Sequence, residues 1–120
     1  MEVTKVAGVT LCVRSMTRAL LFYKDILGLK LLYGDEDSSF CSFDVNGTYV
    51  NLELSERVET SWGRLIFYCN DVDEVHAHLS SRGYLGTKPR DAPWGERFFH
   101  VKDPDGHEVS VATLLKRKGA

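Results

Sequence analysis

The chain has 120 residues, 43% of them hydrophobic, and a formal net charge of −2 at pH 7. This size allows one compact domain, 1–120, and the interspersed charges give no electrostatic footprint for nucleic acid or an anionic membrane. No apolar run reaches the roughly 18 residues of a membrane span, and the first residues lack the pattern of a signal peptide. We therefore expect a cytoplasmic protein that binds neither nucleic acid nor a membrane, and we interpret the basic run 116–118 as a solvated tail.

The three cysteines are far apart and form no CxxC pair: Cys12, Cys41 and Cys69. An odd number at this spacing favours neither a disulfide framework nor a zinc knuckle. Each is most simply a small apolar strand residue, which agrees with a cytoplasmic location.

The first half of the chain, 6–54, has the pattern of a strand, a helix and further strands. In the first and last strands, Val9, Leu11 and Val13 alternate with Gly8, Thr10 and Cys12, and Val50, Leu52 and Leu54 alternate with Tyr49, Asn51 and Glu53. Between them, apolar residues at helical spacing predict an amphipathic helix from Met16 to Leu27, with Ser15 as its N-cap and Gly28 as its stop. We expect the more uniformly apolar set of each strand to face the helix.

The second half, 64–114, repeats this order. Its strands alternate in the same way, Leu65, Phe67 and Cys69 against Arg64, Ile66 and Tyr68, and Val109 and Val111 against Glu108 and Ser110. A second helix is predicted after Asp71 as its N-cap, with Glu74 in the position of a capping box and Gly83 at its end. Its apolar stripe consists of Val72, Val75 and Leu79.

The two halves repeat each other at an offset of about 56 residues, which indicates an internally duplicated fold. We predict an α+β fold of two tandem βαβββ modules, 6–54 and 64–114, that form a curved, mostly antiparallel sheet with a concave groove. The polar strand sets should line this groove, which we interpret as a ligand site, with a partly solvated sheet face as the alternative. The candidate ligand-binding residues are Tyr49, Asn51, Glu53, Arg64, Tyr68, Trp94, Phe98, Glu108 and Ser110.

The aromatic members of this set, together with Trp62, are expected to wall the groove for a planar or amphipathic ligand. The alternative is that Trp62 and Trp94 cover a loop or a subunit contact.

Three segments carry a family resemblance: FYKDILGLKL after the first strand, DVDEVHAHL in the second helix, and PWGERFFHVKDPDGHEVSVA near the end. With the duplicated pattern, they resemble the vicinal oxygen chelate superfamily, which includes glyoxalases, extradiol dioxygenases, fosfomycin-resistance enzymes and bleomycin-resistance proteins. We expect the DPDG segment to form a turn in which Pro104 fixes φ, Gly106 is left-handed and Asp103 bonds the turn backbone. One fold hosts unrelated activities, so the site residues must decide the function.

Metal-dependent members of this superfamily resemble one another in four ligand positions, which fall here at Gly8, Glu53, Arg64 and Ser110. Glu53 is the one good ligand, because glycine offers no side chain and a guanidinium brings a permanent positive charge. The resemblance therefore implies neither a metal nor another cofactor. Glu53 and Arg64 are expected to form an ion pair or to share a grip on a polar ligand.

The histidines offer a fallback metal site at most. His76 and His78 are two apart on the predicted helix and so lie on different faces, while His107 in the turn is expected to cap or to be solvated. His100 is ambiguous, because a β-bulge could aim it into the groove beside Glu108. The fallback metal ligands are Glu53, His100 and Glu108.

The segment PWGERFF resembles bleomycin-resistance proteins, which have the fold but no catalytic metal. The chain has no nucleophile elbow, phosphate loop or dinucleotide fingerprint, and we assign no catalytic residue. The leading hypothesis is a metal-free protein that sequesters an aromatic or amphipathic compound. The alternatives are a glyoxalase- or dioxygenase-type enzyme with an atypical metal site, and a structural or regulatory module without a ligand.

We also expect a homodimer. The superfamily that the chain resembles closes its site with two half-sheets side by side, and each module supplies about four strands. Whether the modules pair within a chain or by exchange between chains stays open.

Overall fold

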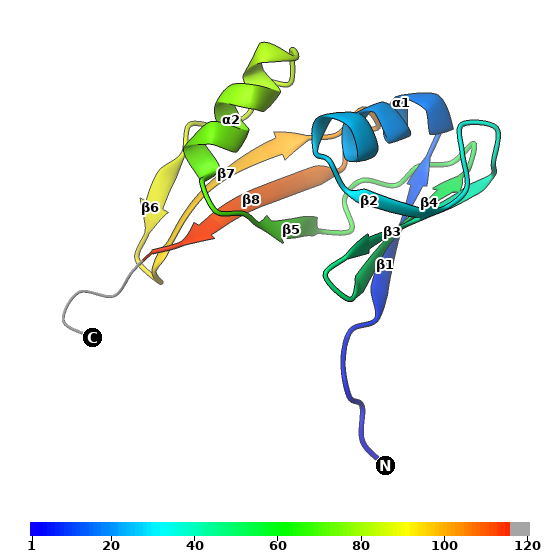
Figure 1. Ribbon diagram of the computed structural model, residues 1–120, viewed down its shortest axis with the longest axis horizontal. Coiled ribbons are helices and arrows are strands. Elements are labelled where there is room, and N and C mark those ends of the chain that lie inside the picture. Colours follow the sequence, from blue (N-terminus) through cyan, green and yellow to red (C-terminus); the bar gives the residue numbers. More distant parts are fainter. Residues whose placement is uncertain (116–120) are drawn as a thin grey trace. The chain divides into compact units, whose positions relative to one another are not determined.

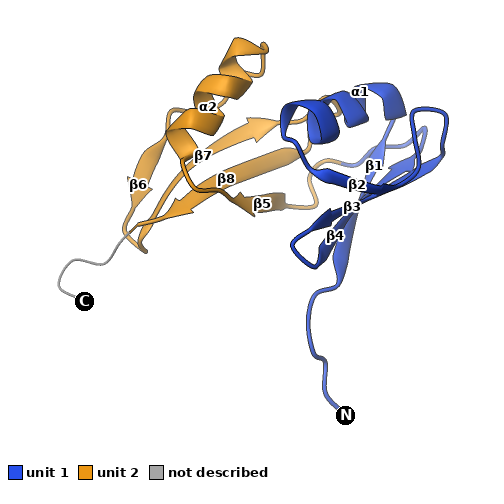
Figure 2. Ribbon diagram, viewed as in Figure 1, with its two compact units in different colours: residues 1–59 blue, residues 60–120 orange. Residues whose placement is uncertain are grey.

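The computed structural model describes residues 1–115, so the basic run 116–118 lies outside the described residues. The chain divides into two compact units, unit 1 at Met1–Glu59 and unit 2 from Thr60 onward (Figure 2). Each unit holds one predicted module, with its own four-stranded mixed sheet and helix, which confirms the α+β class and the duplication. The single domain over 1–120 stays a prediction. Within the described residues, no helix has the length and apolar character needed to cross a membrane.

Unit 1 contains β1 (Gly8–Val13), α1 (Met16–Leu20), η1 (Leu21–Ile26), β2 (Lys30–Tyr33), β3 (Phe40–Val45) and β4 (Thr48–Leu54) (Figure 1). The strands lie in the order β1-β4-β3-β2, with β1 parallel to β4 and the other pairs antiparallel. The predicted alternation buries Leu11, Val13, Val50 and Leu52 on one face. Leu54 is an exception, because it ends β4 and is exposed.

The first helix begins and ends where the sequence predicts, but its second half is π-helical. Ser15 Oγ accepts a hydrogen bond from the Arg18 backbone N–H at 3.3 Å, and Gly28 has a positive φ of 74°. The predicted α-helix is wrong beyond Leu20, since η1 has wider turns, shown by the bond from Leu27 N to Phe22 O at 2.9 Å. The apolar spacing fits either turn width, so the sequence could not distinguish them.

Unit 2 contains β5 (Arg64–Tyr68), α2 (Val72–Ser81), β6 (Arg90–Ala92), β7 (Glu96–Lys102) and β8 (Glu108–Leu114) (Figure 1). Its strand order β5-β8-β7-β6 repeats that of unit 1, with β5 parallel to β8. Helix α2 contacts β7 and β8 on one face of the sheet. The side chains of this face are buried, namely Phe99, Val101, Val109 and Val111 from the strands and Val72 and Leu79 from α2.

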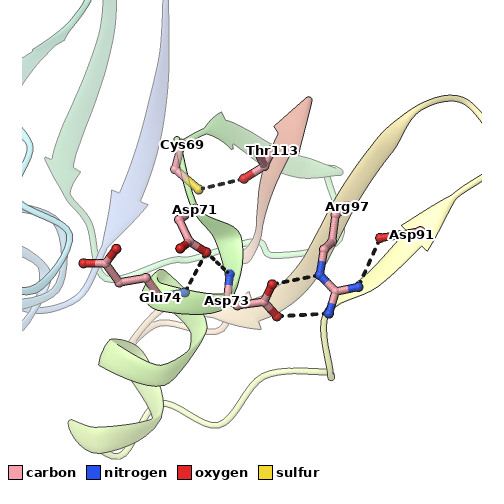
Figure 3. Close-up of polar contacts among 7 residues, drawn as sticks. All are labelled: Cys69, Asp71, Asp73, Glu74, Asp91, Arg97 and Thr113. Atoms are coloured by element: carbon pink, nitrogen blue, oxygen red, sulfur yellow. Dashed lines mark hydrogen bonds and ion pairs between the residues drawn. The ribbon is translucent and has the colours of Figure 1, made fainter. Parts of the chain in front are cut away.

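Polar contacts attach the start of α2 to the sheet (Figure 3). Asp71 Oδ1 caps the helix by accepting hydrogen bonds from the backbone N–H groups of Asp73 and Glu74 at 3.1 and 3.2 Å. Arg97 on β7 donates to both carboxylate oxygens of Asp73, at 2.9 and 3.0 Å, and to Asp91 on β6 at 3.1 Å. The hydrogen bonds from Arg97 and its positive charge lower the pKa of Asp73. One arginine thus joins α2, β6 and β7.

The DPDG segment forms the predicted turn. Asp103 Oδ1 accepts from the backbone N–H groups of Asp105 and His107, both at 2.9 Å, and Gly106 has a φ of 96°. The expectation that His107 is solvated is wrong, since its exposed fraction is 1%. Its Nδ1 accepts a hydrogen bond from Trp62 Nε1 at 2.9 Å, which satisfies the ring in a buried position.

Candidate functional site

Three cross-strand rows of unit 2 emerge from the sheet face opposite α2. The register aligns Arg64 with Glu108 and Lys102, Ile66 with Ser110 and His100, and Tyr68 with Ala112, Phe98 and Arg90. Side chains of one row leave the sheet on the same side, as do residues two apart along a strand. The duplicated module therefore gathers cationic, aromatic and imidazole side chains on one face.

The first polar group of this face is an ion pair. Arg64 Nε lies 3.0 Å from Glu108 Oε2, and both side chains are partly exposed. Arg64 Nη1 also lies 3.4 Å from His100 Nε2. Sequence reasoning pairs Arg64 with Glu53, which belongs to unit 1, so that pairing stays a prediction. Within unit 2, the carboxylate partner of Arg64 is Glu108.

His100 is held between two hydrogen-bond partners. A guanidinium only donates, so Nε2 of His100 accepts from Arg64, and Nδ1 carries the ring hydrogen and donates to Ser110 Oγ at 2.6 Å. Burial, the charge of Arg64 and that of Arg90 lower the pKa of His100, against the opposite effect of Glu108. The ring is therefore neutral at pH 7. It reaches the site in an unbroken β7–β8 ladder, so no bulge is needed to place it on this face.

An aromatic corner lies at the other end of the face. Trp94 and Phe98 are stacked, with ring centroids 5.8 Å apart and an interplanar angle of 25°. Phe98 is buried, whereas Trp94 is 67% exposed. The guanidinium carbon of Arg90 lies 5.0 Å from the Phe98 centroid, a cation–π distance. The corner therefore combines an accessible indole with a positive charge.

Glu96 holds the edge of the indole in this corner. Its Oε1 accepts a hydrogen bond from Trp94 Nε1 at 2.5 Å. The pKa of Tyr68 is raised first by a hydrogen bond to Glu96 and then by burial and the negative charge of Glu96. The phenol therefore stays protonated and donates to this carboxylate. Two donors thus occupy the carboxylate and hold Trp94 and Tyr68 in place.

These groups surround a pocket of about 210 Å³. This volume is below the roughly 300 Å³ at which pockets for drug-sized ligands begin, so the pocket suits a small ring system or one part of a larger compound. It is lined by Arg64, Ile66, Arg90, Trp94, Glu96, Phe98, His100, Ser110 and Ala112.

The corresponding face of unit 1 has a different character. Its middle row is a hydrogen-bonded chain, in which Ser42 Oγ donates to Asn51 Oδ1 at 2.6 Å and Asn51 Nδ2 donates to Thr10 Oγ1 at 3.3 Å. Tyr49 and Glu53, the neighbouring candidates on β4, are exposed. This face is neutral along its centre, and its polar groups satisfy one another.

The structure brings several predicted site residues together. Arg64, Trp94, Phe98 and Ser110 line the pocket, while Glu108 and Tyr68 border it through their bonds to lining residues. Tyr49, Asn51 and Glu53 lie on unit 1, so their role in the same site stays a prediction. Trp62 contacts His107 in a turn of unit 2, which agrees with the alternative that it covers a loop.

Sequence reasoning missed Arg90 and Glu96 as pocket residues, and it placed Ile66 on the groove face without selecting it as a ligand-binding residue. Extending the period-two alternation from Phe98 along β7 reaches Glu96 and His100 without a bulge, so a signal for Glu96 was present. Arg90 had no such signal, because β6 is three residues long.

The residues at the transferred metal positions do not fit a metal ion. A Cβ placed on Gly8 would lie 2.6 Å from the Tyr49 carbonyl oxygen, so even a small side chain there requires a backbone shift. Arg64 donates to Glu108 and to Nε2 of His100, and Nδ1 of His100 is bonded to Ser110. Both ring nitrogens of His100, a fallback metal ligand, therefore already have partners. In the described part of the chain, no three His, Cys, Asp or Glu side chains are grouped to hold a metal.

Comparison with known proteins places the chain in a family. Residues 5–111 match the model of the Glyoxalase/Bleomycin resistance protein/Dioxygenase superfamily, and the chain belongs to this superfamily. The chain is similar to the Bacillus subtilis (strain 168) protein YraH, with 26% identity over 92% of this chain and 99% of that one.

Two solved structures illustrate the range of this fold. TnmS3, an antibiotic binding protein from Streptomyces sp. CB03234, is 26% identical with a TM-score of 0.75, over 95% of this chain and 98% of that one. Lactoylglutathione lyase from Agrobacterium tumefaciens is 18% identical with a TM-score of 0.77, over 93% and 95%. A binding protein and an enzyme thus share this architecture, and the site residues must distinguish them.

Proposed function

We propose that the chain is a metal-free small-molecule binding protein that sequesters an aromatic or amphipathic compound. The observation that carries this proposal is the Trp94–Phe98 stack beside the pocket. Glu96 fixes the exposed indole in one orientation, which gives a planar ligand a prepared surface. Ile66 and Tyr68 are also exposed on this sheet face, and an exposed apolar patch of this kind marks binding sites.

Two further observations support a binding role. The antibiotic binding protein TnmS3 shares the fold and 26% of its residues with this chain. In addition, the imidazole of His100 is occupied by Arg64 and Ser110 rather than available as a metal ligand or a general base. The glyoxalase- or dioxygenase-type enzyme is the competing function, and it requires a metal site that these contacts disfavour.

Calorimetric titration with a panel of polycyclic aromatic compounds tests the binding role. Trp94→Ala should weaken binding by about 1.5–3 kcal/mol, the contribution of burying one large apolar side chain. Leu21→Ala is the control, because Leu21 is an exposed apolar residue of η1 in unit 1, and it should leave binding unchanged. If the wild-type protein binds none of the compounds, the sequestering function is wrong.

Elemental analysis of the dialysed protein separates the binding protein from the enzyme. We expect less than stoichiometric nickel, zinc, manganese or iron, and no increase of the melting temperature when these ions are added. One tightly held metal ion per chain would contradict the proposal and favour the enzyme.

We further propose a cytoplasmic homodimer. Three free cysteines are consistent with a reducing compartment. The exposed Leu85 and Leu114 of unit 2 offer apolar area for a two-fold contact outside the pocket. Sedimentation at micromolar concentration tests the dimer, and a 13.5 kDa species would overturn it.

A further inference from the structure

The arginines of unit 2 differ in the acceptors they contact. Arg97 is bonded to Asp73 and Asp91, and Arg64 is bonded to Glu108. Arg90 lies over the Phe98 ring and forms no ion pair among the described residues. Its guanidinium has five N–H donors, and an aromatic face satisfies none of them as a carboxylate would.

Each acceptor around the pocket, by contrast, already has a donor. Glu96 accepts from Trp94 and Tyr68, Glu108 accepts from Arg64, and the free lone pair of His100 accepts from Arg64. Arg64 uses its Nε and one Nη1 hydrogen in these bonds and keeps further donors. Arg90 is therefore the charged lining residue whose side chain has no hydrogen-bond partner among the described residues.

The position of the free donors relative to the aromatic corner completes the argument. Arg90 and Trp94 both lie against Phe98, at 5.0 Å for the guanidinium carbon and 5.8 Å for the indole centroid. Both residues also line the pocket, so a flat ring that contacts the indole there can present a substituent to the guanidinium. A carboxylate fits a guanidinium with two parallel hydrogen bonds, which is the strongest geometry for such a pair.

We propose that this pocket selects aromatic acids, with Arg90 binding the carboxylate while Trp94 and Phe98 contact the ring. The selection rests on the proposed binding function and names its ligand class. Arg90 is the specificity-determining residue, and the ring contacts supply affinity shared by neutral and charged aromatic compounds. The pKa of His100 is lowered first by burial and then by Arg64 and Arg90, against Glu108, which agrees with two cationic side chains beside the ring.

Calorimetry with three ligands of one shape but different charge tests the selection: 2-naphthoate, 2-naphthamide and 2-naphthylmethylammonium. The wild-type protein should bind the carboxylate at least about tenfold more tightly than the amide, and the ammonium compound most weakly. Arg90→Gln should weaken binding of the carboxylate by about ten- to a hundredfold and leave the amide unchanged. Arg90→Lys keeps the charge without the planar fork and should give an intermediate loss.

The matched control is Arg82→Gln, which removes the same charge from the end of α2, on the opposite side of the sheet. It should bind all three ligands like the wild type, and equal melting temperatures of the variants show that folding is intact. Equal or tighter binding of the amide or the ammonium compound overturns the acid selection while the sequestering function stands. Binding of none of the three overturns both, and equal losses in the Arg82 and Arg90 variants reject Arg90 as the specificity-determining residue.

Discussion

The two units share one backbone plan but present different chemistry on corresponding rows. In unit 1, the middle row Thr10, Asn51 and Ser42 forms a closed chain of neutral hydrogen bonds. In unit 2, the corresponding row holds Ile66, Ser110 and His100, and its imidazole connects onward to Arg64. The two units thus share their strand order and the alignment of these rows. They differ in the side chains of the rows, which bond to one another in unit 1 and leave arginine donors unused in unit 2.

The largest expected effect concerns whether the two units unfold together. Phe43 of unit 1 and Phe99 of unit 2 are both fully buried, so each Phe→Ala change should lower the free energy of unfolding by about 3–5 kcal/mol. Urea unfolding followed by fluorescence and circular dichroism measures this loss. A single domain, 1–120, requires one transition that either variant shifts. Two transitions, each moved by one variant alone, would contradict it.

A matched pair of serines sharpens the comparison of the middle rows. Ser110→Ala leaves the His100 Nδ1–H without its acceptor at a buried position and should cost about 1–3 kcal/mol of stability. Ser42→Ala removes a bond of the same 2.6 Å length at a half-buried position and should cost about 0.5–1.5 kcal/mol. Equilibrium unfolding measures the loss of stability in both variants. A larger loss for Ser42→Ala would contradict the prediction that the serine of unit 2 contributes more stability.

The helix caps provide a smaller contrast. Asp71 accepts from two backbone N–H groups and carries a negative charge at a helix N-terminus, whereas Ser15 accepts from one at 3.3 Å. Asp71→Ala should therefore cost about 1 kcal/mol and Ser15→Ala about 0.5 kcal/mol. Thermal unfolding gives both values, with Asp71→Ser as a control that retains a capping oxygen. Equal losses would show that charge and the second bond add nothing.

Acid sensitivity should be confined to unit 2, where all four histidines lie. In the unfolded chain, His100 is protonated near its ordinary pKa of 6.5. In the folded protein its pKa is lower, because burial and the charges of Arg64 and Arg90 outweigh the charge of Glu108. The unfolded state then binds more protons, so stability should fall as the pH drops below about 6.5. Between about pH 7 and pH 5, the urea midpoint should fall less steeply with decreasing pH in His100→Gln than in the wild type.

An unchanged slope in the His100 variant would show that its neutral form does not contribute to the pH dependence.

Local patterns predicted those parts of the molecule that depend on neighbours along the chain. The alternation placed Leu11, Val13, Val109 and Val111 in the core, and the cap residues Ser15 and Asp71 stand at the helix starts. The expectation for His107 failed because it depends on a partner far away in sequence. His107 is buried because Trp62, 45 residues earlier, satisfies its ring, and no local pattern contains that information.

The site was predicted in part for the same reason. Sequence reasoning selected Arg64, Glu108 and Ser110 because the alternation places them on the groove face. The pairing of Arg64 with Glu108 depends on how β5 and β8 align in the folded protein. Arg90 joins the pocket because β6 aligns it with Phe98, and three residues are too few to show a period. Alternation identifies a face, whereas the partners on that face depend on strand register.

The close approach of β1 to β4 at Gly8 also constrains how this protein could change. The Tyr49 backbone donates to the Ala7 carbonyl at 2.8 Å, and the space beside Gly8 ends at the Tyr49 carbonyl oxygen. A histidine at this position would have to separate the two strands before it could bind anything. A mutational path toward a metalloenzyme would therefore cross a destabilised intermediate, and an engineering attempt should first redesign the pairing of these strands.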